Sequence, residues 1–266
     1  MSPLLREAWV GPGSALREAW LAVRGRRMAQ ALFVQPGAVW SYALEAPHDA
    51  VRHDHLAAWC AAHPHSQAHL VLSGLATHDL VVQDPTLPLH DAAAVAAWAA
   101  HQFVHYHGNA AQHWPVAPWM AGGRCGATAI HGVDLAALQL AAAAQAVRLR
   151  AVRSWWAVAL AAVTQQVPAL ASAVALQVLL VESTLLTQVS CSGGAVRDVQ
   201  QRWLDSPTVP ALHTLLQELV PAEGASAALL LGYGLEEATP AALQALPARV
   251  LGALNGDCPA LQWVAP

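Results

Sequence analysis

Residues 69–85 read HLVLSGLATHDLVVQDP, with two short apolar runs on either side of Ser73-Gly74. Runs rich in Leu and Val that flank a glycine are typical of two consecutive β-strands joined by a turn. A proline step at Asp84-Pro85 then interrupts the chain. A helix is predicted after this break, beginning near Asp91 and stopping at Gly108-Asn109.

The rest of the first half continues this alternation of strands and helices. Runs rich in Val and aromatic residues flank Pro36-Gly37, and they predict a hairpin that opens the first sheet. Residues 133–147, with Asp134 at their start, form the clearest helical pattern in the chain. The remaining elements are predicted as a helical segment over residues 14–30, a helix over 53–62, a strand over 125–131, a strand over 149–155 and a helix over 156–163.

The second half repeats the theme of the first. Its pattern predicts three strands over residues 176–182, 185–191 and 195–204, with a turn at residues 192–194. A helix over 208–220, a buried strand over 226–233 and a helix over 239–254, capped by Thr239, complete the chain. A hairpin, a third strand and a helix therefore recur, which favours mixed sheets covered by helices.

Composition excludes several classes of protein. The 266 residues are 56% hydrophobic and 11% charged, with a mean hydropathy of +0.36, so the chain can bury a large core. All 13 basic residues are Arg, and without Lys there is no P-loop, Schiff-base or protein-kinase chemistry. A net charge of −4 and the lack of a long Arg stripe argue against nucleic-acid binding. The one dense basic group, Arg24, Arg26 and Arg27, fits a solvated turn or a contact with anionic lipid or a partner.

Cysteine usage and hydropathy predict a cytoplasmic protein. The four cysteines show no CxxC spacing, which fits reduced thiols, and the N-terminus lacks the apolar run of a secretory signal. The most apolar stretch, residues 155–181, is interrupted in its middle by polar residues and Pro168. It therefore predicts a buried helix, a turn and a core strand rather than a membrane span.

Three segments together resemble a known family. They are residues 69–85, AAHQFVHYHG at 99–108 and CGATAIHGVDLAALQLAAAAQAVRLRAVRSW at 125–155. Their order and texture resemble PilM and GspL, the cytoplasmic actin-like proteins of type IV pilus and type II secretion machines, over roughly residues 65–205. The resemblance implies an α/β actin-like (ribonuclease H-like) fold with two lobes, whose mixed sheets are flanked by helices. The expected domains are a partly helical extension over 1–30, a first lobe over 31–165 and a second, reduced lobe over 168–266.

The resemblance also indicates where a nucleotide would bind. Actin-like ATPases use an Asp and a Gly-rich hairpin in each lobe, because an acid holds Mg²⁺ while backbone N–H groups donate to phosphate oxygens. The first hairpin here has Gln35 where Asp is expected, and Pro36 lacks an N–H group. The second, residues 181–185, keeps Glu182 but has no Gly. A third family feature, a Gly pair near the adenosine, could correspond to residues 232–234 (Gly-Tyr-Gly), which also suit a simple turn after a strand. We therefore expect no bound cofactor and no catalytic residue.

Histidine is abundant but gives no assigned metal site. Six of the 14 histidines fall within 22 positions, and two HxH pairs could offer ligands to Zn²⁺ or Ni²⁺; they are His48, His53, His55, His63, His65 and His69. A solvated His-rich surface is the alternative. His101 and His105 have HxxxH spacing with His107 just beyond, but Gln102 stands where a zincin needs Glu.

The tryptophans divide into two predicted groups. Trp98, Trp155, Trp156 and Trp203 occupy predicted core faces. Trp114 and Trp119 fall in a Pro-rich stretch that predicts a loop, so they are candidates for contact with a partner.

These observations lead to one main functional hypothesis. The chain is expected to be a non-enzymatic, cytoplasmic scaffold on the inner-membrane platform of a type IV pilus or type II secretion machine. It would bind the tail of a membrane partner in a groove between its lobes, associate peripherally with the membrane through that partner, and bind no nucleic acid. One alternative is a nucleotide-binding ATPase or kinase-like enzyme that uses Glu182 with Asp79 or Asp134. The other is a His-rich metal-binding module.

Overall fold

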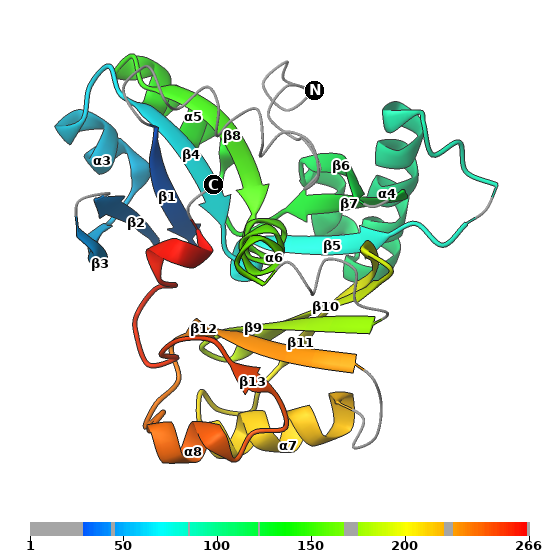
Figure 1. Cartoon of the computed structure of the whole chain (residues 1–266). Helices are drawn as coiled ribbons and strands as arrows, with labels where there is room; N and C mark the ends of the chain where they lie inside the picture. Colours follow the sequence, from blue (N-terminus) through cyan, green and yellow to red (C-terminus); the bar gives the residue numbers. More distant parts are fainter. Residues whose placement is uncertain are drawn as a thin grey trace.

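The computed structural model of the chain describes residues 29–43, 46–84, 86–121, 123–167, 175–220 and 226–264. These residues form two five-stranded sheets and one three-stranded sheet (Figure 1). Most of the segment predicted as helical over 14–30, including Arg24, Arg26 and Arg27, lies outside the described residues. None of the helices in the described parts of the chain is long and apolar enough to cross a membrane.

The first sheet has the strand order β3-β2-β1-β4-β8. Strands β1 and β2 form the predicted hairpin about Pro36-Gly37, where the positive φ of Gly37 suits the tight turn. Strand β4 then pairs in parallel with both β1 and β8. Apolar residues of α3 and α5 pack on one face of this sheet, and α6 lies beside the other. The bounds are β1 Gln30–Gln35, β2 Ala38–Ala43, β3 Ala46–His53, α3 Leu56–Ala62, β4 Gln67–Leu72, α5 Leu135–Ala144, β8 Arg148–Ser154 and α6 Trp155–Gln166.

The second sheet repeats this arrangement with the order β11-β10-β9-β12-β13. A hairpin and a third antiparallel strand again precede a parallel strand, β12, which is the buried strand expected over 226–233. Helices α7 and α8 pack on the face that points away from the first sheet (Figure 1). The bounds are β9 Ala175–Glu182, β10 Leu185–Ser192, β11 Ala195–Trp203, α7 Val209–Leu219, β12 Ser226–Tyr233, α8 Pro240–Gln244 and β13 Arg249–Val250. The mixed α/β class and the repeated unit are confirmed, whereas the exact domain limits stay predictions.

The chain forms a third sheet between β4 and α5. The sequence patterns did not predict that these strands form a separate sheet. Its strands β5 (Thr77–Val81), β6 (Val116–Ala121) and β7 (Arg124–Ile130) are antiparallel in the order β5-β7-β6. Helix α4 (Ala92–His107) packs on β6 and β7, and the Asp91 carboxylate caps it by accepting from the N–H groups of Ala93 and Ala94. The predicted loop around Trp119 is in fact strand β6, and the Trp119 side chain is buried.

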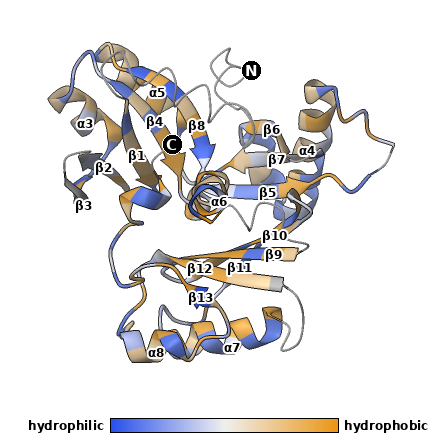
Figure 2. Ribbon diagram, viewed as in Figure 1, coloured by the Kyte–Doolittle hydropathy of each residue, from blue (hydrophilic) through white to orange (hydrophobic). Residues whose placement is uncertain are grey.

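One large apolar cluster joins the two five-stranded sheets. It contains Phe33, Trp155 and Tyr233, whose rings meet at centroid distances of 5.7 Å. The C-terminal segment returns to this cluster, where the Trp155 indole donates to the Trp263 carbonyl at 3.3 Å. Strands β9 and β12 and helix α6 are hydrophobic along much of their length (Figure 2). The stretch 155–181 thus contains a buried helix and a core strand, as predicted.

Two predictions for the second half are wrong. Trp203 is 65% exposed rather than buried, because it ends the edge strand β11. The helix expected over 239–254 stops at Gln244, and Pro247 stands between it and the short edge strand β13. Proline has no N–H to continue a helix, so the chain instead adds a fifth strand to the sheet.

We expect Trp263→Ala to lower the free energy of unfolding by about 3–5 kcal/mol, because it empties a buried aromatic site. The matched change Trp203→Ala removes an exposed side chain and should change this free energy by at most about 0.5 kcal/mol. Urea unfolding followed by circular dichroism measures both. Similar losses in the two variants would contradict the packing of the C-terminal segment.

Candidate functional site

The candidate site lies where the end of β4 meets the hairpin of β9 and β10. Ser73 and Gly74 follow β4 and open the short 3₁₀ helix η1 (Gly74–Ala76). Glu182, the last residue of β9, reaches across from the second sheet. Its Oε1 accepts from the Gly74 N–H at 2.7 Å, and its Oε2 accepts from the Ser73 hydroxyl. The acid retained in the second hairpin therefore binds the chain's own backbone.

The same carboxylate is linked to the first hairpin through two side chains. The Tyr233 hydroxyl donates to Glu182 Oε2 at 2.9 Å and accepts from Gln35 Nε2 at 2.8 Å. The Trp40 indole in turn donates to Gln35 Oε1 at 3.3 Å. Gln35, which stands where the family pattern has Asp, is thus a structural link between the two sheets.

Glu182 is buried without a cation beside it. The one ion pair within the described ranges, Arg52 with Asp54, is exposed and involves neither Glu182 nor its partners. Burial raises the pKa of Glu182 to about 7, although the hydrogen bonds from Ser73, Tyr233 and Gly74 act to lower it. Three donors already contact the two oxygens of this carboxyl group, which makes it a poor ligand for a metal ion.

Glycines allow the close packing around this acid. A side chain at Gly74 would collide with Glu182 Oε1 and Thr187 Oγ1. Gly232 and Gly234, from the Gly-Tyr-Gly turn, have φ values of +153° and +81° and pack tightly against Val181 and Ser183. The turn is therefore explained by backbone packing in the second hairpin, without an adenosine.

A second set of hydrogen bonds extends the contact between the sheets. Gln201 of β11 donates to the carbonyls of Gly74 and Thr77, both at 2.9 Å, and its Oε1 accepts from His78 Nδ1 at 2.7 Å. The His78 ring lies between His107 and His131, with both centroids 4.2 Å away. Burial, then His131, lowers the pKa of His78 to about 4, so its ring is neutral near pH 7.

The acids of the nucleotide-binding alternative have separate roles in the structure. Asp79 of β5 accepts from the Thr128 hydroxyl, and burial raises its pKa to about 6. Asp134 caps α5, where its Oδ1 accepts from the Ala137 N–H at 3.0 Å. Neither acid shares a hydrogen-bond partner with Glu182.

The His-rich segment has structural contacts of its own. His55 caps α3 by accepting from the Ala58 N–H at 3.0 Å, and His63 stacks on Trp59 at the other end of that helix. On α4, His101 and His105 are exposed. Across the described part of the chain, no three His, Cys, Asp or Glu residues come together to hold a metal ion. The His48 side chain lies outside what the structure describes.

The tryptophan candidates for partner contact differ in accessibility. Trp114 is half-buried against His131 and His107, with centroids 5.1 and 5.2 Å away. Buried Trp119 faces Trp156 instead, so it is not available to a partner.

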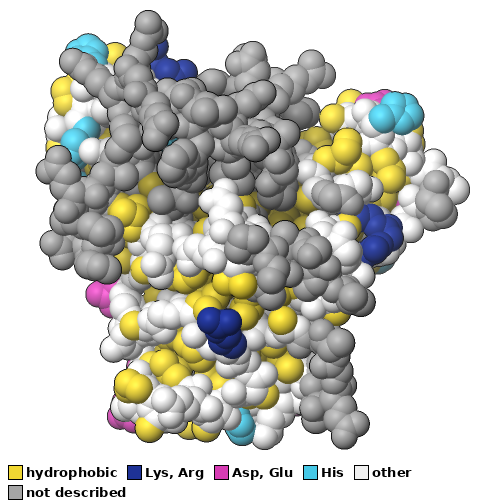
Figure 3. Space-filling model, in the orientation of Figure 1, with side chains coloured by type: hydrophobic (Ala, Val, Ile, Leu, Met, Phe, Trp, Pro, Cys, Tyr) yellow, Lys and Arg dark blue, Asp and Glu magenta, His cyan; other side chains and the backbone are white. Residues whose placement is uncertain are grey.

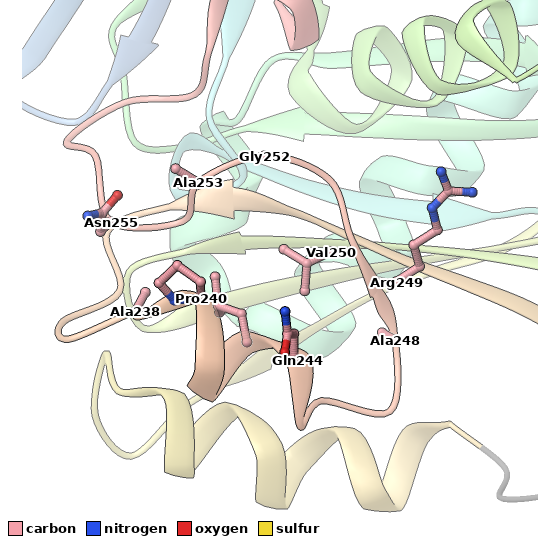
Figure 4. Close-up of a pocket in the computed structure, with 10 residues that line it drawn as sticks. Ala238, Pro240, Gln244, Ala248, Arg249, Val250, Gly252, Ala253 and Asn255 are labelled. Atoms are coloured by element: carbon pink, nitrogen blue, oxygen red, sulfur yellow. The ribbon is translucent and has the colours of Figure 1, made fainter.

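The structure also has a hollow on the far side of the second sheet. It measures about 560 Å³ and lies beside α8 and β13, with Pro240, Gln244, Val250 and Asn255 among its lining residues (Figure 4). Its lining residues belong to α8, β13 and the segments that flank them. None of the residues that bind Glu182 lines it.

Comparison with solved structures identifies the fold. A chain of a PilM-PilN type IV pilus biogenesis complex is 14% identical and matches with a TM-score of 0.55, covering 84% of this chain and 87% of that one. A Bacteroides thetaiotaomicron protein with an actin-like ATPase fold and unknown function is 8% identical, with a TM-score of 0.52 and 96% of both chains covered. The cytoplasmic domain of EpsL, an inner membrane component of the Vibrio cholerae type II secretion system, is 8% identical, with a TM-score of 0.47, covering 84% of this chain and 89% of that one.

No family model matches the sequence, and no curated protein sequence matches it either. The structural likenesses nevertheless confirm the predicted fold: the chain has an actin-like fold similar to that in the PilM-PilN complex.

We expect Glu182→Ala to lower the free energy of unfolding by about 2–4 kcal/mol, because it leaves the buried donors of Gly74 and Tyr233 without an acceptor. Glu182→Gln keeps an acceptor and has no charge. The unfolded Glu182 carboxyl ionises near pH 4.5, whereas the folded one stays protonated up to about pH 7. The wild type should therefore lose stability relative to Glu182→Gln as pH rises from 4.5 to 7, with no further change above.

Urea unfolding at several pH values measures this difference. Glu236→Gln, at an exposed position, is the matched control and should show no such trend. A difference between wild type and Glu182→Gln that does not vary with pH would contradict the buried, raised-pKa state of the acid.

Proposed function

We propose that this protein is a non-enzymatic cytoplasmic scaffold on the inner-membrane platform of a type IV pilus or a related type II secretion machine. In this role it binds the tail of a membrane partner and does not hydrolyse ATP. The observation that carries the proposal is the hydrogen bond from the Gly74 N–H to the Glu182 carboxylate. It joins the two lobes in the region where an actin-like ATPase would hold phosphates.

The chemistry of this contact opposes nucleotide binding. The Gly74 N–H and the Ser73 hydroxyl could otherwise donate hydrogen bonds to a phosphate oxygen, but both already donate to Glu182. Pro36 offers no N–H group in the first hairpin. Proteins usually hold Mg²⁺ through one or two carboxylates together with waters and phosphates, and both oxygens of the buried Glu182 are already hydrogen-bonded.

The fold supports the platform role. The matched chain of the PilM-PilN complex belongs to a type IV pilus biogenesis assembly, and the likeness covers most of both chains. A scaffold needs a stable body with accessible contact residues. The hydrogen bonds that Glu182 and Gln201 make between the two lobes, which we call the seam, contribute to that stability. The half-buried Trp114 and the exposed Trp203 supply candidate anchors, since tryptophan is enriched among the residues that dominate binding energy.

Affinity purification of the tagged full chain from its native cell, followed by mass spectrometry, tests this proposal. We expect pilus or secretion platform proteins in the wild-type eluate and a reduced yield with Trp114→Ala or Trp203→Ala. Leu140→Ala on α5 is the control for Trp203→Ala, because Leu140 is an exposed apolar side chain on another element, at 71% against 65% for Trp203. A wild-type eluate without platform proteins would contradict the proposed role.

A titration with ATP·Mg discriminates this scaffold from a nucleotide-binding enzyme. A ligand at 100 times its dissociation constant stabilises a protein by about 2.7 kcal/mol, and we expect no such thermal shift. Any residual ATP hydrolysis should be the same in wild type and Glu182→Gln, as expected of a contaminant. A rate that falls in Glu182→Gln would instead show that this acid takes part in catalysis.

A further inference from the structure

A cluster of basic side chains lies at the β8 edge of the first sheet. In the parallel pairing of β4 with β8, Arg148 lies opposite Gln67 and Arg153 lies opposite Val71. The register shifts between Ala68 and His69, so β8 contains one extra residue there. This bulge changes which side chains face each side of the sheet.

The bulge places all three arginines of β8 with His69 on one face. Paired residues of parallel strands point the same way, and His69 alternates with Gln67 and Val71 along β4. Arg148 and Arg153 therefore lie on the face that carries His69. Arg150, in the bulge, joins them because its Nε donates to Gln67 Oε1 at 2.8 Å. We call His69, Arg148, Arg150 and Arg153 the basic cluster.

No carboxylate neutralises the basic cluster within the part of the chain that the structure describes. The single ion pair there is Arg52 with Asp54. The Nε of Arg153 is buried and has no hydrogen-bond partner among the described residues, although a buried guanidinium group without a partner is costly. Burial lowers the pKa of His69, and the charges of Arg153 and Arg150 lower this pKa further, to about 4.

We propose that the basic cluster is a binding site for a phosphate group. Arginine presents its N–H groups in a planar fork that suits phosphate oxygens, and three such forks offer more donors than the two oxygens of one carboxylate can accept. A phosphate has up to four oxygens and fits this surplus. A charged edge strand also protects a sheet against unwanted pairing, but that role does not require a half-buried arginine with an unpartnered Nε.

Phosphate of this kind occurs in solution and in the headgroups of anionic phospholipids. A headgroup source would give the protein a direct contact with the bilayer, beyond the partner-mediated contact of the proposed function. The two are separable, because phosphate binding at the basic cluster requires no partner and partner capture requires no phosphate.

The test compares the full-length wild type with the double variant Arg150→Gln, Arg153→Gln. One arm measures sedimentation with phosphatidylglycerol vesicles and with phosphatidylcholine vesicles. The other measures thermal shifts with inorganic phosphate against chloride of equal ionic strength. The control is Arg197→Gln, Arg202→Gln, which removes the same charge from exposed positions on β11. Arg150→Gln alone, at an exposed position, ensures a folded variant if Arg153 proves necessary for stability.

We expect the wild type to prefer phosphatidylglycerol vesicles or to be stabilised by phosphate. For vesicles, binding should fall about five-fold for each arginine removed from the cluster and stay unchanged in the β11 control. A phosphate shift without vesicle binding assigns a soluble phosphate source, and both together assign the headgroup. The proposal is overturned if neither probe binds, if the β11 control loses as much binding, or if a poly-glutamate peptide binds the cluster and phosphate does not.

Discussion

The fold depends on a hydrogen bond between the Glu182 carboxylate and the Gly74 N–H, across the boundary between the two lobes. A backbone N–H at such a boundary needs an acceptor, which can be water, a ligand or a side chain. Here a side chain fills that need, and the Tyr233 hydroxyl extends the contact to Gln35 in the first hairpin. Side chains of the two lobes thus supply the acceptor for the Gly74 N–H, although the Thr187 hydroxyl beside it is buried without a hydrogen-bond partner among the described residues.

Several surrounding features follow from this one contact. Residue 74 must be glycine because Glu182 and Thr187 occupy the space of a side chain. Gln201 can then bind the free carbonyl of the same residue, and His78 binds Gln201 in turn. Burial lowers the pKa values of His78, His107 and His131, so these stacked imidazoles are neutral near pH 7 and add no charge beside Gln201. The space-filling view shows hydrophobic side chains at the surface of the second lobe, on the face drawn in Figure 3.

Much of the fold could be predicted from the sequence, because it rests on local patterns. The Pro36-Gly37 turn, the Asp91 cap and the buried strand over 226–233 are all encoded within a few neighbouring residues. The errors arose where distant parts of the chain decide the outcome. Trp203 has the composition of a core residue but lies at the end of an edge strand, which only the strand order reveals. Strand β6 carries Pro118, which made its sequence resemble a loop.

The candidate site was less predictable than the fold. The motif comparison found Gln35 as a departure from the nucleotide pattern and Glu182 as a retained acid. It gave no sign that Tyr233 and Ser73 bind this acid, since these contacts span 51 and 109 positions of the chain. Gln201 carried no signal at all, because a glutamine on a predicted strand is ordinarily a solvated residue.

An actin-like protein that cycles a nucleotide needs lobes that can move apart, since coupling between a ligand and a distant surface requires two states that bind the ligand differently. In this chain the two lobes share one apolar cluster, and the C-terminal segment packs against Trp155 in that cluster. Glu182 and Gln201 add hydrogen bonds between the lobes along the seam. Moving the lobes apart would expose the apolar cluster and would also leave these buried polar groups without their hydrogen-bond partners. The free-energy cost of opening therefore includes both losses. Lobes held together in this way favour the scaffold that we propose over a nucleotide-driven cycle, and the exposed Trp203 is the candidate contact with a partner in that proposal.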